Sequence, residues 1–254
     1  MKRITFLLFA VFLTIGASAQ TMHTLIFVNK CEQGRQVDRT EDFNNMVNFF
    51  GNIARTLNYS NDMRTHACGE FTAAQVDREI NSLNVNAGDI VVFYYSGHGY
   101  NNDDDKWPHL SLNDKNYWQT DILSKLKSRC GNAKLLLCIA DCCNKGIEGN
   151  NVPGAFNPTD NNYVRQLFTG FQGTKIVIMS ASKQGQYSWS NLRTGAYFGI
   201  CLRKAIDEKT SNNNSSAPTW DDVMEYAKVL TSKYTNNKQE PQYSIQASFN
   251  PFDN

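Results

Sequence analysis

Short, continuous apolar runs recur along the chain, and each is followed by a segment with the spacing of an amphipathic helix. The four clearest runs cover residues 25–28, 90–95, 135–139 and 176–179. Continuous apolar residues, rather than alternating ones, are typical of strands that are covered on both faces by helices. The pattern predicts an α/β fold, a three-layer α/β/α sandwich around a mainly parallel sheet.

Weaker strand signals and the expected helices complete this prediction. Runs near residues 63–66 and 243–247 would bring the sheet to about six strands. Residues 145–174 are rich in Gly, Asn and Pro, and we expect a long loop there that serves as a binding loop, a lid or a cleavage site. Helices are expected over residues 42–58, 72–83 with Thr72 as N-cap, 120–129, 195–207 and 219–234.

The N-terminus has the composition of a secretory signal. Lys2 and Arg3 precede an apolar stretch over residues 4–15, and the small residues Ala-Ser-Ala follow at 17–19. A membrane anchor is the alternative, but the stretch is much shorter than the roughly 20 residues that a spanning helix needs. We therefore expect residues 1–19 to be a cleaved signal peptide, residues 20–254 to form one domain, and the protein to be exported to the periplasm or beyond the cell.

Charge and cysteine content limit the possible partners. The formal net charge is +1, and it becomes −1 without Lys2 and Arg3, so neither nucleic acid nor a membrane surface is an implied partner. Seven cysteines in an exported chain leave at least one unpaired thiol if all pairs are internal. The spacings of Cys and His match no zinc motif, so we expect no metal. The pairing of Cys31, Cys68, Cys130 and Cys201 stays open.

Candidate chemistry lies at the ends of two of the apolar runs. Ser-Gly-His-Gly at 96–99 ends one run, and Asp-Cys-Cys-Asn at 141–144 ends the next. Ligand sites of open α/β sheets lie outside the carboxyl ends of strands, so a histidine and a cysteine can meet there for thiol-based acyl transfer. Side chains at alternate positions of a strand point to the same face. Ser96 and His98 therefore share one face, Asp141 and Cys143 share another, and Cys142 points to the face opposite Cys143. This parity does not show which cysteine lines the cleft.

These segments resemble the active-site motifs of metacaspases, which belong to the caspase-like cysteine peptidases together with caspases, legumain and gingipain. The resemblance covers nearly the whole mature chain and implies a caspase-like fold. In the family's Asp-x-Cys pattern the nucleophile stands third, which selects Cys143; the histidine of a caspase lies about 50 residues upstream of its cysteine. The matching segments are 96–99, 141–146, 42–46, 180–182, 187–189 and 239–242.

The resemblance implies a role for each matched residue. Cys143 would attack the scissile carbonyl, and His98 would give a proton to the leaving amine. The backbone N–H groups of Gly99 and Cys143 would stabilise the oxyanion. It also implies protein or peptide substrates, a monomer and no required cofactor. We identify no third catalytic side chain in the sequence.

Substrate preference can be argued from the residues that differ from caspases. Asp141 stands where caspases have a pocket glutamine, and Ser190 replaces a pocket arginine. An acidic group in place of a neutral one favours Arg or Lys before the cut. Asp42 matches a second pocket acid of metacaspases, although an acid at a helix start has a structural reading too. Ser96 matches a polar pocket wall, and Arg39 stands where a pocket cysteine is common.

Three further hypotheses remain. The acidic run at 103–105 could bind Ca²⁺, although a solvated acidic turn explains it equally well. Self-processing could occur after Lys145, Arg165 or Lys175, in or beside the long loop. The alternative for the whole chain is an inactive caspase-like module that binds proteins, which the presence of both His98 and Cys143 disfavours.

Overall fold

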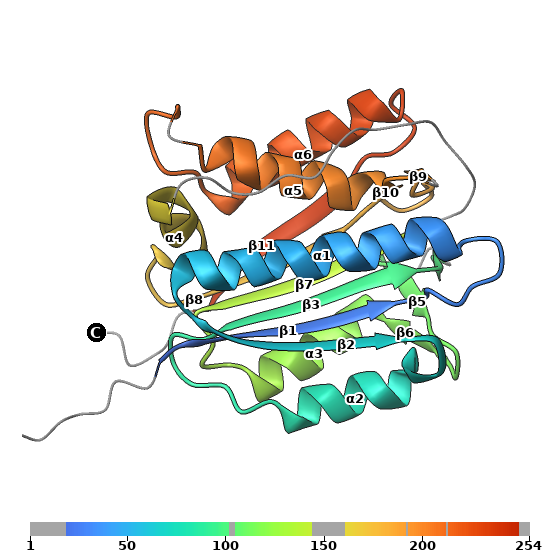
Figure 1. The fold of residues 1–254 in the computed structure, drawn as a ribbon, viewed down its shortest axis with the longest axis horizontal. Helices are drawn as coiled ribbons and strands as arrows, with labels where there is room; N and C mark the ends of the chain where they lie inside the picture. Colours follow the sequence, from blue (N-terminus) through green and yellow to red (C-terminus); the bar gives the residue numbers. More distant parts are fainter. Residues whose placement is uncertain (1–18, 102–104, 144–160, 192, 212, 249–254) are drawn as a thin grey trace, which may run out of the picture.

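A six-stranded sheet forms the centre of the computed structural model, which describes residues 19–101, 105–143, 161–191, 193–211 and 213–248 (Figure 1). Its strand order is β11-β8-β7-β3-β1-β2, and all neighbours are parallel except β11 and β8. The strands are β1 (Thr21–Val28), β2 (Ser60–Ala67), β3 (Ile90–Gly97), β7 (Leu135–Cys142), β8 (Thr174–Ser180) and β11 (Gln242–Ser248).

Helices cover both faces of this sheet. Figure 1 shows α1, α4, α5 and α6 on one face and α2 and α3 on the other, which confirms the three-layer α/β/α sandwich and the mainly parallel sheet of about six strands. The helices are α1 (Gln36–Leu57), α2 (Ala73–Ser82), α3 (Gln119–Arg129), α4 (Asn161–Thr169), α5 (Tyr197–Lys209) and α6 (Trp220–Tyr234).

The apolar runs explain why the sheet carries two cores. All eight residues of β3 are buried, and they alternate between the two faces. Val92 and Tyr94 pack with α1 and α5, whereas Phe93 and Tyr95 pack with α2 and α3. A strand that supplies both cores needs apolar residues on both sides over most of its length, which is why the runs are continuous.

The ends of two helices follow local capping rules. Thr72 accepts a hydrogen bond from the backbone of Gln75 at the start of α2, and Thr219 forms a capping box with Asp222 at the start of α6. Helix α1 begins at Gln36, six residues before the expected start at Asp42. Asp42 therefore lies inside the helix, and its interpretation as a helix-start acid is wrong.

The expectation of a continuous loop over residues 145–174 is also wrong in its second half. Residues 161–169 form α4, because Val164, Leu167 and Phe168 fall at helical spacing and are buried in the core shared with α1. The predicted signal segment up to residue 18, residue 145 and most of the acidic run at 103–105 lie outside the described residues.

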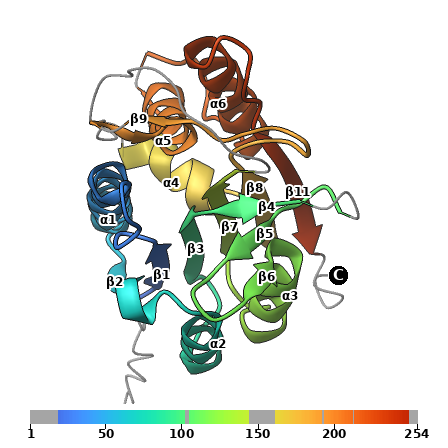
Figure 2. The ribbon, with the colours of Figure 1, turned by 90° about the vertical axis from the view of Figure 1, so that its right-hand side faces the viewer.

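Small additional elements lie beyond the carboxyl ends of the central strands, and Figure 2 views that edge of the sheet. Their strands have two or three residues and give no periodic signal in the sequence. Within the part of the chain that the structure describes, no helix is long and apolar enough to span a membrane. The elements are β4 (Gly99–Tyr100), β5 (His109–Ser111) and β6 (Asn116–Trp118) in one sheet, β9 (Ser190–Asn191) and β10 (Gly195–Ala196) in another, and the 3-10 turn η1 (Cys68–Glu70).

Candidate active site

His98 and Cys143 follow directly after the neighbouring parallel strands β3 and β7. The last residues of these strands, Gly97 and Cys142, are partners in the sheet register, so the next residue of each chain segment emerges at the same edge. Both side chains line one cavity of about 140 Å³. The rest of its lining comes from Arg35, Arg39, Gly97, Asp141, Cys142, Ser188, Trp189, Ser190 and Ala196.

The two adjacent cysteines have different environments. Cys142 is buried and packs with Tyr95 in the core beneath the sheet, where burial raises the pKa of its thiol well above the ordinary value. Cys143 is half-buried and donates a hydrogen bond from Sγ to the carbonyl of Ser188 at 3.3 Å. The structure therefore leaves Cys143 as the more accessible thiol, in agreement with the motif.

The environment of Cys143 favours the protonated thiol over the thiolate. Burial raises its pKa, and the neighbouring Arg39 and Arg35, which act in the opposite direction, do not offset that effect. A thiol with a raised pKa is a poor nucleophile until a base removes its proton. Any acyl transfer at this site therefore needs a base at the cavity.

His98 is the candidate base at the cavity, and both its backbone and its ring have hydrogen-bond partners. Its carbonyl accepts hydrogen bonds from the Tyr95 hydroxyl at 2.6 Å and from the Ser111 N–H at 3.0 Å. Its Nε2 lies 2.5 Å from Oε1 of Glu32, in the connection between β1 and α1. Glu32 was not among the predicted site residues, because nothing in its local sequence indicates a contact with a histidine 66 residues away.

Gly99 lies against the backbone of the candidate nucleophile. A Cβ atom at this position would stand 2.4 Å from Cys142 Sγ and 2.6 Å from the carbonyl oxygen of Cys143. These distances exclude any side chain, so glycine is required for the close approach of the two segments. Its role as an oxyanion donor stays a prediction.

The three predicted pocket residues do come together. Ser96 donates a hydrogen bond to Oδ2 of Asp42 at 2.8 Å, and the Tyr94 hydroxyl donates to Oδ2 of Asp141 at 3.3 Å. However, Nη1 of Arg39 donates to Ser96 Oγ at 2.8 Å and lies 3.7 Å from Asp42 Oδ2. An internal guanidinium thus occupies the position where the acidic pocket was expected to receive a basic substrate residue.

The two carboxylates also cap helix α5, which has no side-chain cap from its own N-cap residue. Asp42 Oδ1 accepts from the Ala196 N–H at 2.6 Å, and Asp141 Oδ2 accepts from the Gly199 N–H at 2.9 Å. Negative groups are stabilising at a helix N-terminus, where backbone N–H groups lack partners. Both acids therefore have a structural role that the motif did not reveal.

Two glycines make these caps possible, and sequence reasoning missed both. A Cβ on Gly195, whose φ is +89°, would lie 2.2 Å from Asp42 Oδ1. A Cβ on Gly199 would lie 2.8 Å from Asp141 Oδ2. Any side chain at either position would displace a buried carboxylate from the helix terminus.

The cavity carries less negative charge than Asp42 and Asp141 suggest in the sequence. Burial raises the pKa of Asp141 to about 8, and Asp42 adds to the effect while Arg39 opposes it. Burial likewise raises the pKa of Asp42. Asp141 is therefore more easily protonated than an ordinary carboxyl, and Asp42 is paired with Arg39, so the cavity carries less negative charge than two free carboxylates would give it.

A second cation also stands at the cavity. The resemblance to caspases predicts the loss of a pocket cation, because Ser190 stands in place of an arginine. In the structure the Arg35 guanidinium contacts Ser190 Oγ and pairs with Asp38 at 2.7 Å. A cation from a different segment of the chain therefore lies beside Ser190.

The described residues contain no group of three or more His, Cys, Asp or Glu side chains placed to hold a metal ion. Asp105, the described member of the acidic run, accepts hydrogen bonds from the Trp107 N–H at 3.2 Å and the Thr120 hydroxyl at 3.3 Å. Calcium binding by the acidic run stays a hypothesis.

Comparisons with known proteins show the fold and the family of the chain. Two solved structures share the fold. A protein from Geobacter sulfurreducens is 14% identical, with a TM-score of 0.53, and the match covers 91% of this chain and 95% of that chain. Caspase-1 from Spodoptera frugiperda is 12% identical, with a TM-score of 0.58, and the match covers 89% of this chain and 88% of that chain. No curated protein matches the chain. The family model for the caspase domain of the C14 peptidases matches residues 25–252. The chain therefore belongs to the caspase domain family of peptidases.

Proposed function

We propose that the chain is a cysteine endopeptidase in which Cys143 is the nucleophile and His98 transfers protons. The observation that carries this proposal is the placement of both side chains on one cavity, from the ends of adjacent parallel strands, in a caspase domain. The motif resemblance supports a metacaspase-like member of the family.

The resting contacts suggest the order of events. Substrate binding would draw Cys143 Sγ away from the Ser188 carbonyl and toward the scissile carbonyl. As the S–C bond forms, the thiol proton passes to Nδ1 of His98, whose Nε2 is held by Glu32. His98 then gives the proton to the leaving amine as the C–N bond breaks. Water hydrolyses the thioester, His98 removes the water proton, and the thiol is restored.

Cleavage after Arg or Lys remains part of this proposal, supported by the two acids beneath the cavity. Arg39 is the observation against it, because a basic substrate residue would have to displace its guanidinium from Ser96 and Asp42. Since Arg35 and Arg39 both line the cavity, an acidic residue before the cut is the second candidate.

A fluorogenic peptide panel tests both levels of the proposal. Peptides that differ only in Arg, Lys, Asp or Ala before the cut would be compared on the wild type and on Cys143→Ala. Turnover that Cys143→Ala abolishes supports the peptidase, and the preferred peptide decides between the two pocket hypotheses. If no peptide is cleaved and a thiol-reactive peptide probe fails to label Cys143 in native protein, the inactive binding module becomes the better hypothesis.

The positions of Arg165 and Lys175 reduce the number of candidate sites for self-cleavage. Arg165 lies in α4, where its guanidinium donates to the carbonyl of Leu57 at 2.9 Å, and Lys175 lies in β8, paired on both sides. Peptidases cut extended, accessible segments, so neither site suits them. We propose Lys145 as the self-cleavage site, and mass spectrometry of purified wild type and Cys143→Ala should show a cut after it in the wild type alone.

Export also stays a proposal, and the structure offers one supporting fact. Cys31 and Cys68 form a disulfide, whereas Cys130, Cys138, Cys142, Cys143 and Cys201 are free. Disulfides persist in oxidising compartments and are rare in the cytosol. N-terminal sequencing of the mature protein would show whether it begins at Gln20.

A further inference from the structure

Glu32 is the side chain that restrains the ring of His98. The carboxylate lies 2.5 Å from Nε2, and 18% of the Glu32 side chain is exposed against 57% of the His98 side chain. Glu32, the more buried of the two side chains, therefore restrains the orientation of the more exposed His98 ring. Because Nε2 is engaged, the remaining ring nitrogen, Nδ1, is available to substrate or thiol in the cavity that His98 lines.

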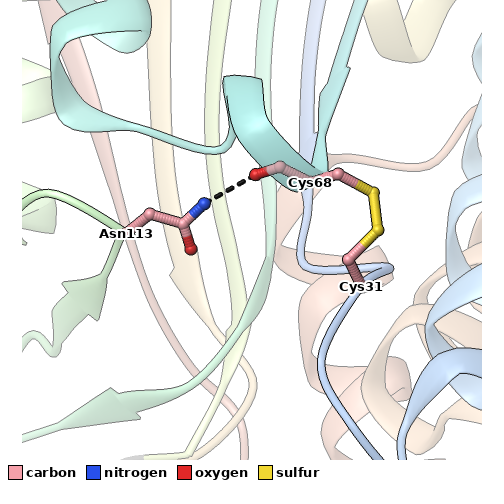
Figure 3. Close-up of a disulfide and its surroundings, with 3 residues drawn as sticks. All are labelled: Cys31, Cys68 and Asn113. Atoms are coloured by element: carbon pink, nitrogen blue, oxygen red, sulfur yellow. Dashed lines mark hydrogen bonds between the residues drawn. A yellow bond between two sulfur atoms is a disulfide. The ribbon is translucent and has the colours of Figure 1, made fainter.

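The segment that carries Glu32 is itself tethered. Cys31, its neighbour in the chain, is bonded to Cys68 in the turn η1 that follows β2 (Figure 3). The carbonyl of Cys68 accepts a hydrogen bond from the Asn113 side chain at 2.6 Å, and the Asn113 N–H donates to the carbonyl of Phe71 at 3.0 Å. The disulfide thus connects the segment before α1 to the hairpin formed by β5 and β6.

The same hairpin holds the backbone of His98. Strand β4 begins at Gly99, directly after the histidine, and pairs with β5. The Ser111 N–H, at the end of β5, donates to the His98 carbonyl at 3.0 Å. Both partners of the Glu32–His98 contact are therefore attached to the small sheet of β4, β5 and β6. Glu32 is attached through the Cys31–Cys68 disulfide, and the backbone of His98 is attached through β4 and β5.

We propose that Glu32 is a positioning residue of the peptidase site, and that the Cys31–Cys68 disulfide keeps it within reach of His98. The carboxylate holds the imidazole in the tautomer with the proton on Nε2 and stabilises the imidazolium that forms when Nδ1 accepts a proton. Glu32 does not line the cavity, so it acts through His98 and not on the substrate. The inference rests on the proposed function and deepens it.

The ionisation of Glu32 is consistent with this role. Burial raises its pKa, but the hydrogen bond and charge of His98, together with Arg39 and Arg35, outweigh burial and hold the pKa below its ordinary value. The carboxylate is therefore charged at neutral pH.

The closing experiment compares Glu32→Gln with Glu70→Gln. Glu70 contacts another histidine, His66, at 3.2 Å in the same disulfide-bonded region, so its variant makes the same charge change without touching His98. We expect Glu32→Gln to lower kcat about 100-fold with KM nearly unchanged, because the loss affects proton transfer and not binding. Glu70→Gln should keep both constants. A Glu32→Gln enzyme with wild-type kcat, or one in which KM alone rises, overturns the proposal.

Nuclear magnetic resonance of the histidine rings separates this inference from the proposed function. In ¹⁵N-labelled wild type, the His98 ring should show a protonated, strongly hydrogen-bonded Nε2 that Glu32→Gln weakens and Glu70→Gln does not. This signature requires no turnover. Unchanged His98 resonances in Glu32→Gln overturn the inference even in an active enzyme, whereas their change in a protein that cleaves no peptide supports the positioning role while the proposed function fails.

The disulfide is tested by the paired substitution Cys31→Ser and Cys68→Ser, which avoids reductants that also act on Cys143. We expect kcat to fall about 10-fold with KM nearly unchanged, in the same direction as Glu32→Gln and smaller, since the segment can still reach His98 part of the time. Near-ultraviolet circular dichroism verifies folding. Wild-type kcat in the folded double variant would remove the disulfide from the proposal, and Glu32→Gln would still test the carboxylate.

Discussion

A pair of carboxylates, which is the first set, and a single carboxylate, which is the second, lie at the carboxyl edge of the sheet, and they differ in what they contact. Asp42 and Asp141 are buried, accept hydrogen bonds from the start of α5 and face the internal cation Arg39. Glu32 is partly exposed and contacts His98. The first set stabilises the start of α5, and Asp141 of this set also lines the cavity, whereas Glu32 restrains the ring of the candidate base His98. Family motifs pointed to the first set, and geometry revealed the second.

The largest effect that tests this contrast is on stability. Asp42→Ala should lower the free energy of unfolding by about 3 to 5 kcal/mol, because it removes a cap of α5 and leaves the buried Arg39 without its nearest carboxylate. Urea denaturation measures the change. Glu41→Ala, one position earlier on α1, removes the same charge without the cap and should cost less than about 1 kcal/mol. Equal losses in the two variants would show that Asp42 is not a cap.

A smaller effect concerns the cation of the cavity. Arg39→Met should raise the ratio of Arg-peptide to Asp-peptide turnover about 10-fold, since it removes the positive charge between Ser96 and Asp42 while keeping most of the side-chain volume. The readout is kcat/KM on the two peptides. Arg55→Met, at the other end of α1, is the control for charge. An unchanged ratio would mean that Arg39 does not shape the pocket.

The smallest effect is the pH dependence of stability. Burial raises the pKa of Asp141 to about 8 in the folded protein, from an ordinary value near 3.8, so the folded state binds more protons between these values. Stability should therefore fall as pH rises, by up to about 1.4 kcal/mol per pH unit for one group.

Comparison with Asp141→Asn isolates this contribution. Thermal or urea unfolding between pH 6 and 8 should show a flatter decline in the variant than in the wild type, because an amide stands in for the protonated acid at every pH. If both proteins lose stability equally over this range, Asp141 is ionised in the folded state and the cavity is more acidic than its contacts suggest.

Much of the fold could be predicted because its signals are local. The continuous runs in β3 and β7 indicated a doubly covered sheet, and Thr72 and Thr219 mark helix starts by hydrogen bonds within their own segments. Helix α4 was missed because Gly, Asn and Pro before it outweighed the apolar spacing of Val164, Leu167 and Phe168. The small sheets around β4 and β9 have strands of two or three residues, too short for a periodic signal.

The sequence by itself determined the sandwich, because continuous apolar runs predict strands covered on both faces. It also placed His98 and the Cys142–Cys143 pair directly after two of those strands, and the resemblance to metacaspases selected Cys143. Tertiary structure alone decided how charge is distributed around His98 and Cys143. Arg39 neutralises Asp42, Arg35 places a cation beside Ser190, and Glu32 reaches His98 from a segment tethered by Cys31. The Arg39–Asp42 pair itself is local, since the two residues are three positions apart on α1. The contacts of these side chains with Ser96 and with the start of α5, and the contact of Glu32 with His98, join segments remote in the chain, and no spacing along the sequence encodes those distances.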